Sequence, residues 1–223
     1  MIRFTYRFGL FIFLFGGIFC FAQEKKQFSS VSGILQRIVP NIKTDTWILI
    51  HQSGGQDKII KESGAKKEYV TQSTGFNIGI EEEGEFYYIV YFSAGKAEYV
   101  TNLDGLRTFV GKVDGIEDAA VIASTEGYII DEEFKDLAGN YSEDANNYYL
   151  DLGKLTSREC PYQKKHFTIA VNKSSGNITN IKDNGSYIEL YYKKCTNNPR
   201  LLKLEKKEES KDDSKKKPAT KRR

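Results

Sequence analysis

The sequence has few of the residue types on which most metal sites and catalytic sites depend. Its 223 residues include three cysteines, two histidines, four prolines, one tryptophan and one methionine. Two histidines are too few for a zinc cluster, and two of the cysteines are expected to pair with each other rather than to bind a metal. We therefore expect neither a metal nor another cofactor.

Recognisable catalytic motifs are also missing. The sequence has no Gly-x-Ser-x-Gly nucleophile elbow and no glycine-rich phosphate loop. His51 stands two residues before Ser53, but closeness in sequence is not the geometry of a catalytic triad. The sequence therefore favours a protein that is not an enzyme. A secreted hydrolase without a recognisable motif is an alternative, which a pocket that gathers His51 or His166 with carboxylates would support.

Residues 1–22 have the pattern of a secretory signal peptide. Arg3 and Arg7 supply a positive start, residues 8–21 are apolar apart from glycines, and Ala22 offers a small residue at the cleavage point. The apolar run is shorter than the roughly 20 residues that a membrane-spanning helix needs. We expect an exported protein, periplasmic or extracellular, that is cleaved near Ala22.

An oxidising compartment gives the remaining two cysteines a role. We expect Cys160 and Cys195 to form a disulfide, and two unpaired cysteines are the alternative. A disulfide that closes a loop of about 35 residues contributes roughly 4 kcal/mol of stability in a chain-entropy treatment. One bridge in a chain of this length supplements a hydrophobic core and does not replace it.

The segment between these cysteines contains the clearest strand pattern in the sequence. Residues 166–172 and 186–194 alternate apolar and polar side chains, as strands with two unlike faces do. Asn184-Gly185 is the strongest two-residue hairpin signal in the chain. Together with a short middle strand at 177–182, it would make a three-stranded meander.

The disulfide argues against that meander. A meander would hold the cysteines more than about 20 Å apart, whereas a disulfide needs its Cα atoms within about 7 Å. We therefore expect the two long strands to pair directly, with Lys165 opposite Lys194 and residues 174–185 as a long tip. A chain that doubles back over residues 160–165 is the alternative.

Most of the remaining body, residues 23–202, has period-two patterns. We expect one short helix within 28–39, capped by Ser29 or Ser30, with an apolar face that packs on the body. Residues 116–124 are ambiguous between strand and helix. Strands are expected at 46–51, 58–61, 67–72, 75–80, 85–93, 96–101, 106–113, 127–130 and 148–152.

These patterns predict the fold class. About ten short strands are typical of an antiparallel sandwich or barrel, and the apolar run at 86–92 is typical of a central strand covered on both faces. We predict a single all-β domain with one short N-terminal helix. An α+β fold is the alternative.

Tyrosines supply the candidate contact surface. The chain has 14 tyrosines, six of them in three adjacent pairs. Neighbouring residues of a strand point to opposite faces, so one tyrosine of each pair is expected outside. We predict that Tyr87, Tyr149 and Tyr191 form a surface for protein or glycan, although sheets also favour tyrosine for packing alone.

The C-terminal residues 203–223 are predicted to be a disordered, solvated tail. They carry 10 basic and 5 acidic residues, and the leader carries two arginines, so the body accounts for −4 of the total charge of +3. The basic end offers contact with an anionic surface such as lipid head groups, and no specific nucleic-acid binding is expected. These residues are Lys215, Lys216, Lys217, Lys221, Arg222 and Arg223.

The sequence thus predicts an exported binding or structural module of the cell envelope or the extracellular space, without catalytic activity. Trp47 in the first expected strand invites comparison with lipocalin-like barrels, which carry Gly-x-Trp near their start. Asp45 stands where that glycine would be. A ligand-holding barrel of this kind is therefore an alternative function.

Overall fold

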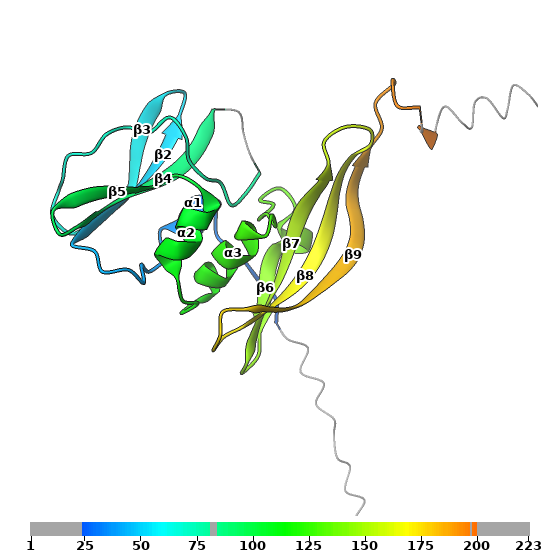
Figure 1. Ribbon diagram of the computed structural model, residues 1–223. Coiled ribbons are helices and arrows are strands. Elements are labelled where there is room, and N and C mark those ends of the chain that lie inside the picture. Colours follow the sequence, from blue (N-terminus) through cyan, green and yellow to red (C-terminus); the bar gives the residue numbers. More distant parts are fainter. Residues whose placement is uncertain (1–23, 81–83, 197, 200–223) are drawn as a thin grey trace, which may run out of the picture.

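The computed structural model describes residues 24–80, 84–196 and 198–199 (Figure 1). They form two antiparallel β-sheets, one of five strands and one of four, and neither closes into a barrel. The predicted mainly antiparallel β fold is confirmed. The predicted leader and basic tail lie outside the described residues.

The four-stranded sheet is made of two hairpins. Its strands are β2 (Thr46–Ser53), β3 (Gln56–Ser63), β4 (Glu85–Ser93) and β5 (Lys96–Val100), in the spatial order β3-β2-β4-β5. The hairpins turn at Gly54-Gly55 and Ala94-Gly95, and all four residues have positive φ. Two-residue turns of this conformation match the twist of the strands that they join.

The five-stranded sheet contains the longest strands. It consists of β1 (Lys26–Gln27), β6 (Gly139–Glu143), β7 (Asn147–Ser157), β8 (Tyr162–Asn172) and β9 (Ile178–Leu190), and these lie side by side in that order. In Figure 1, β7, β8 and β9 form a curved ribbon on the side of the molecule opposite the four-stranded sheet.

Four short helices complete the fold of the described residues. They are α1 (Val31–Leu35), α2 (Leu103–Val110), α3 (Ile116–Thr125) and α4 (Lys135–Ala138). The Ser30 hydroxyl accepts from the Gly33 amide at 3.0 Å, which confirms the predicted cap of the first helix. Asn102 caps α2 in the same way, at 2.8 Å from the Gly105 amide.

One apolar core joins the two sheets. Trp47 and Ile89 from the four-stranded sheet belong to the same buried cluster as Leu150 and Ile169 from the five-stranded sheet. Helices α2 and α3 lie between the sheets in Figure 1, and α3 is buried along most of its length. The apolar face of α1 also packs into this core, as predicted.

The structure corrects several expected strands. Residues 106–113 fall largely in α2, because Leu106, Phe109 and Val110 are buried at helical spacing behind the Asn102 cap. Residues 116–124 belong to α3, which resolves that ambiguity as helix. Residues 67–72 form no strand, and 75–80 make only isolated bridges.

The cysteine-bounded strands pair directly, as predicted, but the register differs from the expected one. Lys165 lies opposite Ser186 rather than Lys194, and the tip is only the short segment between Asn172 and Ile178. Asn184-Gly185 is not a hairpin, because it forms a bulge inside β9, with Gly185 at φ 95°. The strong turn signal thus marks an irregularity within a strand.

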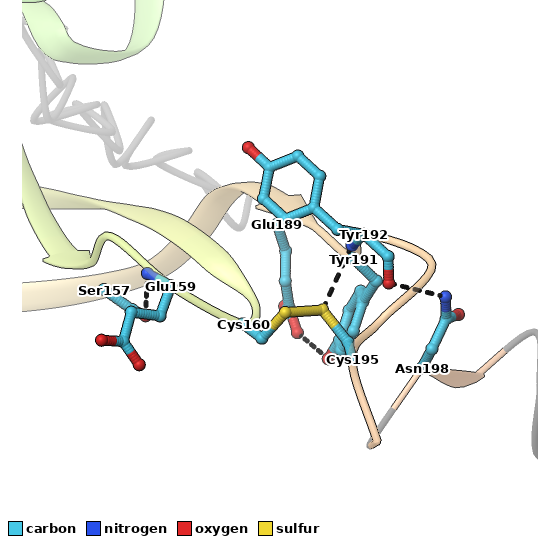
Figure 2. The surroundings of a disulfide bond; sticks show 8 residues. All are labelled: Ser157, Glu159, Cys160, Glu189, Tyr191, Tyr192, Cys195 and Asn198. Carbon is cyan, nitrogen blue, oxygen red and sulfur yellow. Dashed lines mark hydrogen bonds between the residues drawn. A yellow bond between two sulfur atoms is a disulfide. The ribbon is translucent and has the colours of Figure 1, made fainter.

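The disulfide closes the open end of this strand pair (Figure 2). Cys160 and Cys195 are bonded, with their Cα atoms 5.5 Å apart, so the predicted pairing is confirmed. The Cys195 amide donates to the Tyr192 carbonyl at 3.0 Å, and this hydrogen bond closes the turn that carries the cysteine. The Tyr192 amide in turn donates to the Cys195 sulfur at 3.2 Å.

Candidate binding groove

Short backbone bridges connect the two sheets on one side of the core. Phe76 exchanges two hydrogen bonds of 2.8 Å with Tyr87 of β4. Gly79 forms a parallel β-bridge with Ile130. The residue before it, Ile129, exchanges backbone hydrogen bonds of 2.8 and 2.9 Å with Gly153 of β7. Segments 76–80 and 128–131 therefore form a hydrogen-bonded link between the sheets.

A groove lies along this link. It has two lobes, of about 540 Å³ and about 510 Å³, which both have Asn77, Gly79, Ile80, Tyr162 and Lys164 in their walls. The two lobes share these five residues in their walls, so they are adjacent. Each is in the size range of cavities that bind small ligands.

The two lobes differ in the side chains that they do not share. We call one the basic lobe, since it adds Arg158 and the hydroxyl residues Ser124, Tyr128, Thr156 and Ser157 to the shared five. We call the other the acidic lobe. It adds His51, Glu85, Tyr87, Glu132 and Glu133.

A buried ion pair stands where the lobes meet. Lys164 of β8 and Asp131 have side chains only 5% and 0% exposed, and the Lys164 ammonium lies 2.9 Å from the carboxylate. The Tyr187 hydroxyl of β9 donates to the same carboxylate oxygen at 2.7 Å. Burial and this hydrogen bond raise the pKa of Tyr187, so its hydroxyl stays protonated as a donor.

His51 lies in the acidic lobe, beside Glu85. His51 of β2 lies opposite Tyr87 of β4, on which its ring stacks, and Glu85 is its diagonal neighbour, with a carboxylate oxygen 3.5 Å from His51 Nε2. Ser53 donates to the other oxygen of Glu85 at 2.7 Å. The carboxylate thus stands between serine and histidine, whereas in a catalytic triad the histidine contacts the nucleophile.

The other two acidic side chains of this lobe come from the loop before α4. The Glu132 carboxylate accepts from the Val31 amide at the start of α1. The Glu133 amide donates to Asp131 at 3.2 Å, so this loop is tied to the buried ion pair. Burial, followed by the charge of Glu132, raises the pKa of Tyr87.

The structure does not bring the predicted tyrosine surface together. Tyr87 is only 8% exposed, which corrects its expected outward position. Both faces of β4 are covered, because Tyr87 packs into the main core and Tyr88 into a second cluster on the outer face of the four-stranded sheet. Tyr149 and Tyr191 are half-buried on separate segments, hydrogen-bonded to Asp144 and Glu189 respectively.

His166 belongs to a different cluster, centred on Asp151 of β7. The Asp151 carboxylate accepts from Lys25 at 2.5 Å and from Thr168 at 2.6 Å, and His166 Nε2 lies 2.9 Å away. Burial alone would raise the pKa of Asp151, but these three partners outweigh it and hold the pKa below the ordinary value. This cluster ties the N-terminal segment to the five-stranded sheet.

Sequence reasoning missed most of the groove. Lys164, Asp131 and Tyr187 are separated by tens of residues, and no local pattern marks them as neighbours. The charge of Lys164 gave no usable signal, because Gln163 and Lys165 on either side of it are also polar. The six basic residues predicted to contact polyanions, from Lys215 to Arg223, lie outside the described residues.

Within the described ranges, no group of three or more histidine, cysteine or acidic residues is arranged to hold a metal ion. In the same part of the chain, no helix has the length and apolarity that crossing a membrane requires.

Comparison with known proteins does not assign the chain to a family. No protein-family model matches the chain, and no curated protein or solved structure matches it significantly. The functional argument therefore rests on the groove and its chemistry.

Proposed function

We propose that the protein is an exported, non-catalytic binding module that holds a small ligand in the groove between its two sheets. The observation that carries this proposal is a pair of adjacent lobes that share Lys164 in their walls, a buried cation held in place by Asp131. A concave site with a few fixed polar groups is the usual form of a ligand pocket. The lipocalin-like alternative requires a closed barrel around its ligand, whereas this groove lies between two open sheets.

Export is part of the proposal. The Cys160–Cys195 disulfide is typical of an oxidising compartment. The signal-peptide pattern of residues 1–22 agrees with that environment.

One observation favours the alternative of a secreted hydrolase. The acidic lobe gathers His51 with Glu85, Glu132 and Glu133, the combination that acid–base catalysis uses. The order of Ser53, Glu85 and His51 nevertheless differs from that of a nucleophilic triad. Hydrolysis that is abolished in a His51→Gln variant would favour the hydrolase over the binding module.

The groove is tested by a small-molecule fragment screen read by amide NMR. We expect hits that shift the amide signals of Gly79 and Gly127, which lie in the groove walls. A Thr156→Trp variant, which places an indole in the basic lobe, should lose these hits. Thr179→Trp, on an exposed position of β9 outside the groove, is the matched control and should keep them.

The screen also defines what would refute the proposal. Hits that bind equally well to Thr156→Trp, or hits whose shifts map only to other surfaces, would show that the groove is not the ligand site. No hit at millimolar concentration would lead to the same conclusion.

A further inference from the structure

The pair Asn184-Gly185 is the one Asn-Gly sequence in the chain, and it lies in the bulge of β9. The residues before and after the pair, Asp183 and Ser186, lie opposite Phe167 and Lys165 of β8. The pair itself has no opposite residue in β8, so the regular pairing of the two strands is interrupted there. In the described part of the chain β9 is also an edge strand, so no further strand holds the bulge from its other side.

Both residues of the pair are open to solvent. Asn184 and Gly185 are exposed, and a Cβ atom added to Gly185 would have no other atom within 4 Å. Glycine has no side chain that would hinder its own backbone nitrogen from approaching the Cγ atom of the preceding asparagine. That approach closes a succinimide ring, which is the first step of asparagine deamidation.

Asp183 places a carboxylate on the nitrogen that would attack. The Gly185 amide donates to the Asp183 carboxylate at 2.8 Å. The hydrogen bond from Lys165, at 2.8 Å, holds the pKa of Asp183 below its ordinary value, so this carboxylate is ionised at neutral pH. A carboxylate within hydrogen-bond reach of an N–H group is positioned to accept its proton as the nitrogen forms a new bond.

From this arrangement we propose that Asn184 is a self-modification site, at which water converts the asparagine to aspartate or isoaspartate through a succinimide formed with Gly185. In the first step the Gly185 nitrogen bonds to Asn184 Cγ, and the bond between Cγ and Nδ2 breaks. The proton of the Gly185 amide passes by way of Asp183 to the departing Nδ2, which leaves as ammonia.

In the second step water opens the succinimide ring. Attack at the side-chain carbonyl gives aspartate, and attack at the main-chain carbonyl of Asn184 gives isoaspartate. Water is the only co-reactant. The inference is independent of the groove and of export, because it needs only the folded bulge.

The reaction changes the charge beside the Asp151 cluster. Asn184 Nδ2 donates to the Thr168 hydroxyl at 2.8 Å and lies 3.5 Å from His166 Nε2. Thr168 and His166 both contact the Asp151 carboxylate. In the aspartate product an oxygen replaces Nδ2, so the donor to Thr168 is lost and a second carboxylate stands next to the cluster.

The test is to keep the folded protein at neutral pH and to digest samples with trypsin over several days for mass spectrometry. In the peptide of residues 183–193 Asn184 is the only asparagine, and we expect its progressive conversion to aspartate and isoaspartate. The peptide of residues 174–182 is the internal control. Its Asn177 and Asn180 are exposed but precede isoleucine, whose branched side chain hinders the attack, so they should stay unmodified.

Two variants examine the role of Asp183. Asp183→Ser removes the carboxylate that accepts the Gly185 proton, and it should slow conversion of Asn184 about tenfold or more. Glu189→Gln removes another carboxylate of β9 and is the matched control, which should convert at the rate of the wild type.

A synthetic peptide of residues 183–193 serves as the reference. If the folded protein is unchanged when this peptide has reacted completely, the fold protects Asn184 and the inference is wrong. Equal conversion of Asn177 or Asn180 would show that exposure alone, and not the bulge with its glycine, directs the reaction. An unchanged rate in Asp183→Ser would refute the role of Asp183 as the base.

Discussion

At the scale of single residues, Asp131 is the most deeply buried charged residue in the described part of the chain. Its carboxylate has no exposure to solvent, and it accepts from Lys164, Tyr187 and the Glu133 amide. A buried charge is tolerated only when its partners replace the water that it has lost. The stability of this site therefore depends on each of these hydrogen bonds.

Tyr187→Phe tests that dependence. Removing the hydroxyl takes one donor from a buried carboxylate, which typically costs about 1.5–3 kcal/mol. We expect the free energy of unfolding, measured by urea denaturation, to fall by that amount. The control is Tyr149→Phe. The Tyr149 hydroxyl bonds to Asp144 near the surface, so its removal should lower the free energy of unfolding by less than about 1 kcal/mol. Equal losses in both variants would mean that burial of Asp131 does not matter.

Asp151 gives the protein a predictable dependence on acid. Its pKa in the folded protein is lower than the ordinary value of 3.8, so the ionised form stabilises the fold. This contribution is complete above the pKa of the unfolded chain and is lost as the pH falls through the lowered pKa of the folded protein.

The corresponding variant is Asp151→Asn. It should be less stable than the wild type at pH 7, and the difference should shrink as the pH is lowered from 5 to 2, in urea unfolding at each pH. Asp183→Asn is the control, because Asp183 pairs with Lys165 at an exposed site and should matter little for stability at any pH. A difference that stays constant with pH would contradict the assigned role of Asp151.

At the scale of elements, the strand pair β8–β9 depends on its disulfide. Beyond the last paired residues, Tyr162 and Leu190, Cys160 and Cys195 fix the two chain ends (Figure 2). The double variant Cys160→Ser, Cys195→Ser should lose up to about 4 kcal/mol of unfolding free energy. Reduced wild type should unfold at the same urea concentration as the double variant. An unchanged midpoint would show that strand packing alone holds this end.

The link between the sheets requires close backbone approach. A Cβ atom on Gly75 would lie 2.2 Å from the Tyr87 carbonyl oxygen of β4, too close for any real contact. Gly75→Ala should therefore cost about 2 kcal/mol or more in thermal or urea unfolding. Gly115→Ala, where a Cβ meets only ordinary contacts, should cost less than about 1 kcal/mol. A harmless Gly75→Ala would mean that the bridge to β4 moves freely.

The elements also show where sequence patterns succeed and fail. Residues 46–51 and 85–93 were predicted correctly because each strand has its own apolar pattern, and β4 is covered on both faces. The α2 region was misread, since Leu106, Phe109 and Val110 fit a short helix only once the Asn102 cap is recognised. The turn signal at Asn184-Gly185 failed because glycine with positive φ serves a bulge as well as a hairpin.

At the scale of the whole molecule, the proposed export and the Cys160–Cys195 disulfide can be tested by one measurement. The intact mass of the secreted protein should correspond to a chain that begins at Gln23, and alkylation without reductant should label no thiol. Cys20 leaves with the signal peptide, so a labelled thiol would mean either a retained leader or an open disulfide. Either result would contradict the proposed exported state.

The sequence alone determined the mainly β class, the cap and core face of α1 and the disulfide, because these depend on short-range periodicity, on local capping chemistry and on a choice among few cysteines. Only the tertiary structure decided the register of β9, the burial of Tyr87 and the ion pair between Lys164 and Asp131. These features arise between segments far apart in the chain. Their positions follow from how the two sheets pack around α2 and α3, which no local pattern encodes.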